Sequence, residues 1–98
     1  MIVYHIVLPE KWAEFTGDLY WAPSLETEGF IHCSFEDQLD AVIKRYYSAA
    51  DSIIILQIET DKLMSRLVNE PSTNNEIYPH IYGPINRPAI ASVEERHL

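Results

Sequence analysis

The chain has 98 residues, of which 47% are apolar, and a formal net charge of −8 at pH 7. This length and apolar content fit one compact domain over residues 1–98 and exclude a disordered chain. A surface this acidic repels phosphate backbones, so we expect no general nucleic-acid binding. The single cysteine, Cys33, cannot form an internal disulfide, which favours a reducing compartment such as the cytoplasm.

The first segment, IVYHIVL at residues 2–8, is rich in β-branched and aromatic side chains and predicts a strand. Pro9 ends this strand and opens a short helix over residues 9–15. The apolar run has no basic residues before it, which favours a first strand over a signal peptide. No segment approaches the about 18 apolar residues of a membrane span, so we expect no membrane insertion.

The middle of the chain predicts a short strand over residues 28–33 and one long amphipathic helix over residues 35–47. Ser34 is expected to cap this helix, with Asp37 three residues later as the partner of a capping box. The helix is indicated by apolar residues that recur on one face: Phe35, Leu39, Val42, Ile43 and Tyr46.

The second half predicts three strands, over residues 52–58, 67–70 and 89–93. The first of them is a continuous apolar run, which is typical of a strand buried on both faces. Residues 71–75 predict a loop, and residues 78–84 predict an irregular segment because two prolines and a glycine interrupt it. The fold class expected from these elements is α+β, a single domain with a split, twisted sheet.

His5 and His32 are the first two candidate site residues. Alternation along the first strand places His5 on one face with Val3 and Val7, as either a core histidine bonded to a backbone carbonyl or a site residue. His32 points away from its neighbour Cys33, so we assign His32 to a site and Cys33 to the core.

Ser34 is open to two interpretations, a helix cap alone or a cap that also contributes to an anion site at the helix N-terminus. His80 lies between Tyr78 and Tyr82 in a proline-bounded segment, as a site residue or as a packing residue. Glu70, like Glu28, is either a solvated end of its segment or a site residue.

The spacing of the histidines, the cysteine and the glycines does not favour a metal site, a cysteine nucleophile or a phosphate-binding loop. The histidines and the cysteine do not form an HxH, HxxxH or CxxC pattern, so we expect no metal site. Successive residues of a strand point to opposite faces, so Cys33 points away from His32. This disfavours a cysteine nucleophile, which needs an imidazole beside its thiol. The three glycines are scattered and form no phosphate-binding loop.

Two strings, GFIHCS at residues 29–34 and PHIYGP at residues 79–84, together with Tyr4-His5 and Glu70, resemble a small bacterial family known as domain of unknown function 952. That family is similar to the ADP-ribosyltransferase-like superfamily, whose members bind NAD in a cleft between two halves of a split sheet. The resemblance implies that this chain has the same fold and binds NAD.

The resemblance also implies roles for particular residues. His5 suits the residue that holds the ribose, and His32 with Ser34 suits the pocket for nicotinamide. Glu70 or His80 suits the third group, at the reacting carbon or the acceptor.

Two further residues are expected to contact the ligand at such a site. We expect Tyr82 in the pocket and Arg87, just past the PHIYGP string, as the best contact for an anion. No arginine lies inside GFIHCS or PHIYGP, which disfavours RNA as a substrate.

The sequence therefore predicts an ADP-ribosyltransferase-like protein that binds NAD or a related nucleotide and transfers or hydrolyses ADP-ribose. It would be a monomer or a weak homodimer. The alternative is a non-catalytic module on the same fold that binds a small ligand or a partner. A third interpretation makes the histidines structural and the surface around Trp12, Tyr20 and Trp21 a dimer interface.

Overall fold

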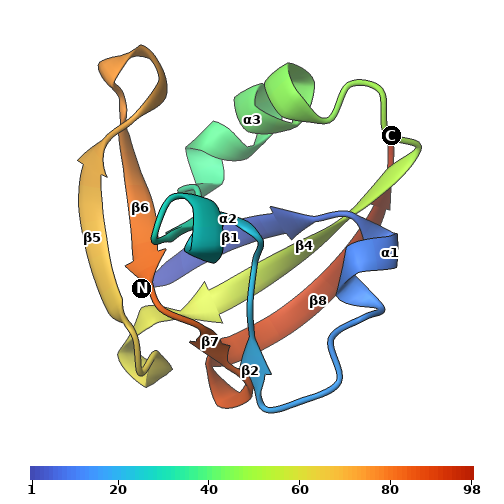
Figure 1. The fold of residues 1–98 in the computed structure, drawn as a ribbon. Coiled ribbons are helices and arrows are strands. Elements are labelled where there is room, and N and C mark those ends of the chain that lie inside the picture. Colours follow the sequence, from blue (N-terminus) through green and yellow to red (C-terminus); the bar gives the residue numbers. More distant parts are fainter.

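The computed structural model describes residues 1–98 and shows an α+β fold with several antiparallel sheets and short helices (Figure 1). The first sheet has the order β1-β4-β8 and contains β1 (Ile2–Val7), β4 (Ser52–Glu59) and β8 (Ile90–His97). The second has the order β3-β6-β5 and contains β3 (Ile31–His32), β6 (Ile77–Tyr82) and β5 (Arg66–Pro71). A small third sheet pairs β2 (Leu19–Tyr20) with β7 (Ile85–Asn86).

The helices are α1 (Pro9–Trp12), α2 (Ser24–Thr27) and α3 (Leu39–Tyr46). Four short 3₁₀ turns lie at Glu36–Gln38, Thr60–Lys62, Thr73–Asn75 and Arg87–Ala89. None of the helices has the length and apolar character needed to cross a membrane.

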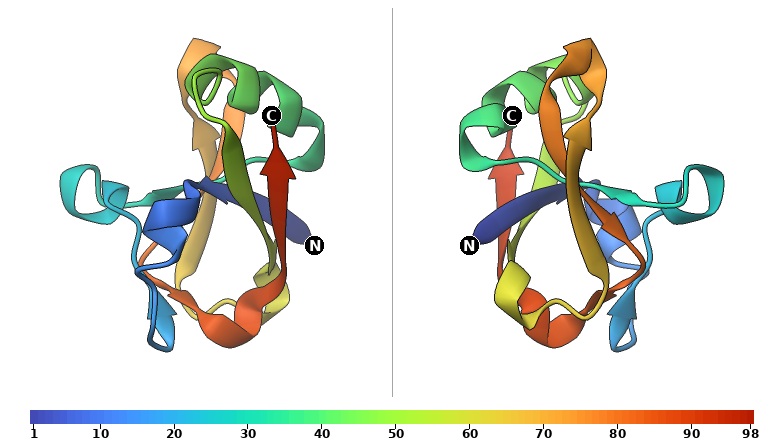
Figure 2. Two further views of the ribbon diagram at one scale, coloured as in Figure 1. Left: turned by 90° about the vertical axis from the view of Figure 1, so that its right-hand side faces the viewer. Right: turned by 90° about the vertical axis from the view of Figure 1, so that its left-hand side faces the viewer.

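One isolated backbone bridge joins the two three-stranded sheets. The backbones of Tyr4 in β1 and Ser34, just after β3, form a reciprocal bridge with N···O distances of 2.8 and 2.7 Å. The β5–β6 hairpin stands beside the first sheet, and α3 lies between the hairpin tip and that sheet (Figure 2). The bridge brings β3 alongside β1, and with it His32 close to His5.

The core forms on both faces of β4, as its continuous apolar run predicts. Ile54, Leu56 and Ile58 belong to the larger buried cluster, which also contains the inward side chains of β3 and β6. Ile53 and Ile55 point the other way and pack with Leu39 of α3. Predicted strands 2–8 and 52–58 are confirmed by β1 and β4, and β8 extends beyond the predicted residues 89–93.

The helix predicted over residues 35–47 is shorter than expected. A 3₁₀ turn precedes α3, which covers only Leu39–Tyr46. The prediction that Ser34 and Asp37 cap this helix is wrong, because Gln38 accepts the hydrogen bond from the Phe35 N–H at 2.9 Å. Ser34 is held through its backbone by the bridge to Tyr4 instead.

The prediction of an irregular segment over residues 78–84 is also wrong, because most of it belongs to β6, the central strand of its sheet. Pro79 accepts a hydrogen bond from the Cys33 N–H at 3.1 Å, so its carbonyl faces the β3 edge. The N–H that proline lacks would face the same edge, at the point where β3 ends. Pro79 therefore costs β6 no hydrogen bond to β5.

Candidate functional site

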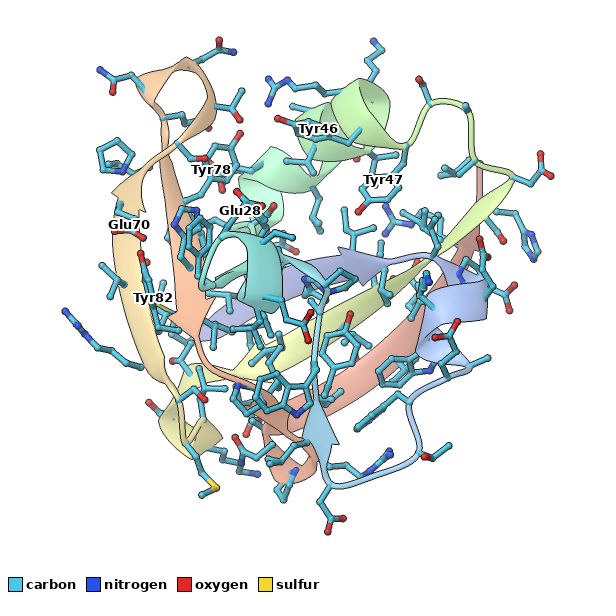
Figure 3. The ribbon with its side chains drawn as sticks, viewed as in Figure 1. Glu28, Tyr46, Tyr47, Glu70, Tyr78 and Tyr82 are labelled. Atoms are coloured by element: carbon cyan, nitrogen blue, oxygen red, sulfur yellow. The ribbon has the colours of Figure 1, made fainter.

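A cavity of about 750 Å³ lies between β1, α3, the segment from β2 to β3 and the tip of the β5–β6 hairpin. We call it the cleft. His5, His32 and Ser34 all line it, as do Glu28 and five tyrosines: Tyr4, Tyr20, Tyr46, Tyr47 and Tyr78. Figure 3 shows Tyr46 and Tyr47 at α3, Tyr78 on the hairpin and Glu28 between α2 and β3. The volume is in the range of small-molecule sites.

His5 is buried at the inner wall of the cleft and has both ring nitrogens bonded. Its Nδ1–H donates to the backbone carbonyl of His32 at 2.7 Å. Since that carbonyl can only accept, the neutral ring leaves Nε2 to accept from the Tyr20 hydroxyl at 2.9 Å. Burial lowers the pKa of His5 to about 4, against the opposing effect of the carbonyl bond, so the ring is neutral at pH 7.

Tyr20 and Cys33 stay protonated beside His5. Burial raises the pKa of the Tyr20 phenol and of the Cys33 thiol well above their usual ranges. Tyr20 is therefore a neutral hydroxyl donor, and Cys33 is a small buried side chain rather than a thiolate nucleophile. The assignment of Cys33 to the core is confirmed by its burial.

His32 and Glu28 form an imidazole–carboxylate pair at the mouth of the cleft. His32 Nε2 lies 2.9 Å from Glu28 Oε2, and about half of each side chain is exposed. The backbone turns between them at Gly29, whose φ of 88° suits glycine. This pair places a carboxylate at the cleft, where the sequence interpretation had Glu28 as either a solvated end or a site residue.

Glu70, His80 and Tyr82 come together in a second group, which we call the Glu70 cluster. The His80 Nδ1–H donates to Glu70 Oε1 at 2.7 Å, and the Tyr82 hydroxyl donates to the same oxygen. These bonds, that of Tyr82 first, lower the pKa of the Glu70 carboxyl, and the carboxylate in turn raises the pKa of Tyr82. The Phe30 ring stacks on His80 at 4.0 Å between centroids, and the buried His80 Nε2 has no hydrogen-bond partner.

The Glu70 cluster does not line the cleft. Glu70 is the cross-strand partner of Tyr78, and Tyr82 lies on the same face of β6, further from the hairpin tip (Figure 3). His32 borders both groups, because it is the cross-strand partner of His80 and their ring centroids are 5.5 Å apart. The structure thus brings together His5, His32 and Ser34, and separately Glu70, His80 and Tyr82.

Arg87 lies apart from both groups. Its Nε and Nη2 donate to the Gly17 carbonyl at 3.1 and 2.9 Å, and its guanidinium stacks over the Phe15 ring at 4.3 Å. This arginine holds a surface loop in place and does not line the cleft, where the sequence interpretation had it contact an anion.

A comparison with models of protein families identifies the family of this chain. The model of the family described as "Protein of unknown function (DUF952)" matches residues 6–93. The chain belongs to this family. No curated protein matches it.

The DUF952 chain is similar in fold to solved structures of protein CC0527 from Caulobacter crescentus. The crystal structure of CC0527 shares 20% identity with a TM-score of 0.81, over 97% of this chain and 85% of that one. A double mutant of CC0527 gives 19% identity and a TM-score of 0.80 over the same shares. At this identity the likeness concerns the fold alone.

The strings that led to DUF952 meet in space. Ile31 pairs with Ile81 and His32 with His80 across β3 and β6, so GFIHCS and PHIYGP lie on neighbouring strands.

Sequence reasoning missed the cleft's tyrosine lining and the pairing of Glu28 with His32. The spacing of four residues between Glu28 and His32 across a glycine was the available signal. The structure shows no group of three His, Cys, Asp or Glu residues that could hold a metal.

Proposed function

We propose that the cleft binds NAD or a related nucleotide and that the protein transfers or hydrolyses ADP-ribose, as the resemblance to ADP-ribosyltransferase-like proteins implies. The observation that carries the proposal is the meeting of His5 and His32 in one cleft, where the two three-stranded sheets join. In that superfamily the ligand lies between the halves of a split sheet. We propose that the β1-β4-β8 and β3-β6-β5 sheets are those halves.

The residues of the cleft fit the nicotinamide-ribose end of such a ligand. Tyr20, fixed by His5 at 2.9 Å, has a hydroxyl oxygen that can accept a hydrogen bond from a ribose hydroxyl. Tyrosine rings offer faces on which a planar heterocycle can stack. Because His5 is neutral and held on both nitrogens, this wall is preorganised and needs no rearrangement to accept a ligand.

The chemistry of NAD, when bound, is the breaking of the bond between ribose and nicotinamide, which builds positive charge on the sugar. A carboxylate close to that sugar stabilises developing positive charge. Glu28 is the carboxylate that lines the cleft, and it is fixed by His32. An imidazole beside the reacting atoms can also act as a general acid or base, and His32 is held there by Glu28.

A second candidate, a binding module without turnover, is favoured by one observation. Glu70 and His80, which the resemblance assigns to the third catalytic role, do not line the cleft. If Glu28 does not take that role, the cleft has a ligand pocket but no group for the chemical step.

The test is a nicotinamide-release assay with NAD, run beside a binding titration. Release by the wild type that falls at least about tenfold in Glu28→Gln, with retained folding, supports the enzyme. Binding of NAD without release supports the module. Absence of both binding and release would contradict the proposal.

A further inference from the structure

We propose that the cleft selects a cationic nucleoside, an N-ribosylated pyridinium without phosphates, in preference to the dinucleotide. This inference rests on the proposed function, since it keeps the nicotinamide–ribose end of the ligand in the cleft, and it changes the group that is transferred or hydrolysed from ADP-ribose to ribose. Its basis is a cleft with many aromatic rings, a carboxylate and few positive charges.

Positive charge is scarce in the lining of the cleft. The chain has seven lysines and arginines, and Lys11 alone among them lines the cleft. Lys11 is exposed and lies 3.8 Å from Glu14. A pyrophosphate is usually held by arginines or by several backbone amides, because it carries two negative charges in a short span.

Arg45 does not line the cleft but contacts two tyrosines that do. Arg45 Nη1 lies 3.5 Å from the Tyr78 hydroxyl, and its guanidinium lies 5.8 Å from the centre of the Tyr46 ring. The same Tyr78 hydroxyl lies 3.5 Å from the Glu76 carboxylate. Arg45 and Glu76 thus approach the same hydroxyl, which places one positive and one negative charge beside Tyr78, and Arg87 is engaged with the Gly17 carbonyl.

Negative charge surrounds the ligand site. Glu28 lines the cleft, and the chain as a whole has a net charge of −8. Both repel a phosphate and attract a cation, and the attraction is strongest within about 10 Å at ordinary salt.

The lining of the cleft is rich in aromatic rings. Five of the six tyrosines in the chain line the cleft. A tyrosine face attracts a planar cation through its ring quadrupole. Burial raises the pKa of Tyr20 and Tyr47, so both remain neutral phenols whose hydroxyls can meet ribose hydroxyls. A ribosylated pyridinium matches the lining with its cationic ring and its uncharged sugar.

The experiment compares the dissociation constants of nicotinamide riboside, its uncharged dihydro form, nicotinamide mononucleotide and NAD by calorimetry, at about 0.05 M and about 0.5 M salt. We expect nicotinamide riboside to bind at least as tightly as NAD, and about threefold or more tighter than the dihydro form. NAD binding more than about tenfold tighter, and weakening with salt, would overturn the inference while keeping the proposed function. If none of the four binds, both are overturned.

A pair of variants tests the aromatic step. Tyr46 is 58% exposed, so its substitution should leave the fold intact. Tyr46→Phe keeps the ring and should keep the affinity for nicotinamide riboside, whereas Tyr46→Leu should weaken it about threefold. Equal affinity of the two variants would overturn the role of the ring at this position.

Discussion

His5 and His80 are both buried histidines on strands, yet their environments differ at the second ring nitrogen. Each donates from Nδ1 at 2.7 Å, His5 to a backbone carbonyl and His80 to the Glu70 carboxylate. His5 Nε2 then accepts from Tyr20 in the cleft, whereas His80 Nε2 is buried without a partner beneath Phe30. The two residues are of the same type, and the difference comes from their neighbours: Tyr20 in the cleft for His5, and the Phe30 ring for His80.

The comparison teaches that a resemblance in sequence does not decide which residues share a site. His5 reaches the cleft because the Tyr4–Ser34 bridge joins the two sheets beside it. His80 lies one strand further into the second sheet, where Phe30 covers it. The predictions below test this division, from the largest expected effect to the smallest.

The first prediction concerns stability and pH at His5. Its pKa is about 4 in the folded protein and about 6.5 in an unfolded chain, so the unfolded state binds the proton first as pH falls. The stabilisation is complete above about pH 6.5 and decreases through pH 4, by about 3 kcal/mol in all and about 2 kcal/mol by pH 5. Urea unfolding at these pH values measures it. His5→Gln should remove this part of the slope, and an unchanged slope would contradict the neutral, buried His5.

The second prediction concerns Gln38, which ties α3 to the hairpin that carries Tyr78 and the Glu70 cluster. Its Nε2 donates to the Glu76 carboxylate at 2.9 Å and to the Ile77 carbonyl at 2.8 Å. Gln38→Ala removes both of these bonds and the one that the Gln38 side chain accepts from the Phe35 N–H, and should reduce the free energy of unfolding by about 2 kcal/mol. The control is Asp37→Ala, at an exposed neighbour, with an expected change within about 0.5 kcal/mol. Equal effects would contradict the role of Gln38 as the tie.

The third prediction compares two carboxylates, each bonded to a histidine. Glu28→Gln removes the charge at the cleft and should weaken binding of nicotinamide riboside about tenfold, whereas Glu70→Gln should change it less than about twofold. Calorimetry on both variants, with melting curves to confirm folding, gives the answer. The reverse order would move the site from the cleft to the Glu70 cluster.

The smallest effect is expected at Arg87, which lies outside both groups. Arg87→Lys loses the paired bonds to the Gly17 carbonyl and the stacking on Phe15, and should cost about 1 kcal/mol of stability. Ligand affinity should stay the same. A loss of affinity with unchanged stability would return Arg87 to the role of anion contact.

The regular parts of the fold were predictable because their patterns are local. The apolar run of β4 and the β-branched residues of β1 identify both strands without any partner. The segment at β6 was not predictable by the same rules, since proline breaks a ladder unless its missing N–H lies where the neighbouring strand ends. That condition depends on where β3 ends, which the sequence does not state.

The site was predictable in part, for a similar reason. The alternation of side chains along β1 and β3 predicts which face of its strand each of His5 and His32 occupies. The backbone bridge between the two sheets brings the two residues together. The pairing of His80 with Glu70 depends on the register of the β5–β6 hairpin, and the position of Arg87 depends on a loop distant in sequence. Contacts between residues far apart in the chain leave no periodic signal.

The most direct test of the account is a histidine map of ligand binding. NAD is titrated into ¹⁵N-labelled protein, and the ring signals of the four histidines are followed by NMR. The account predicts that the His5 and His32 rings shift in a saturable way, while those of His80 and His97 shift much less. Shifts centred on His80, or no shifts at millimolar NAD, would contradict the claim that the cleft binds this ligand.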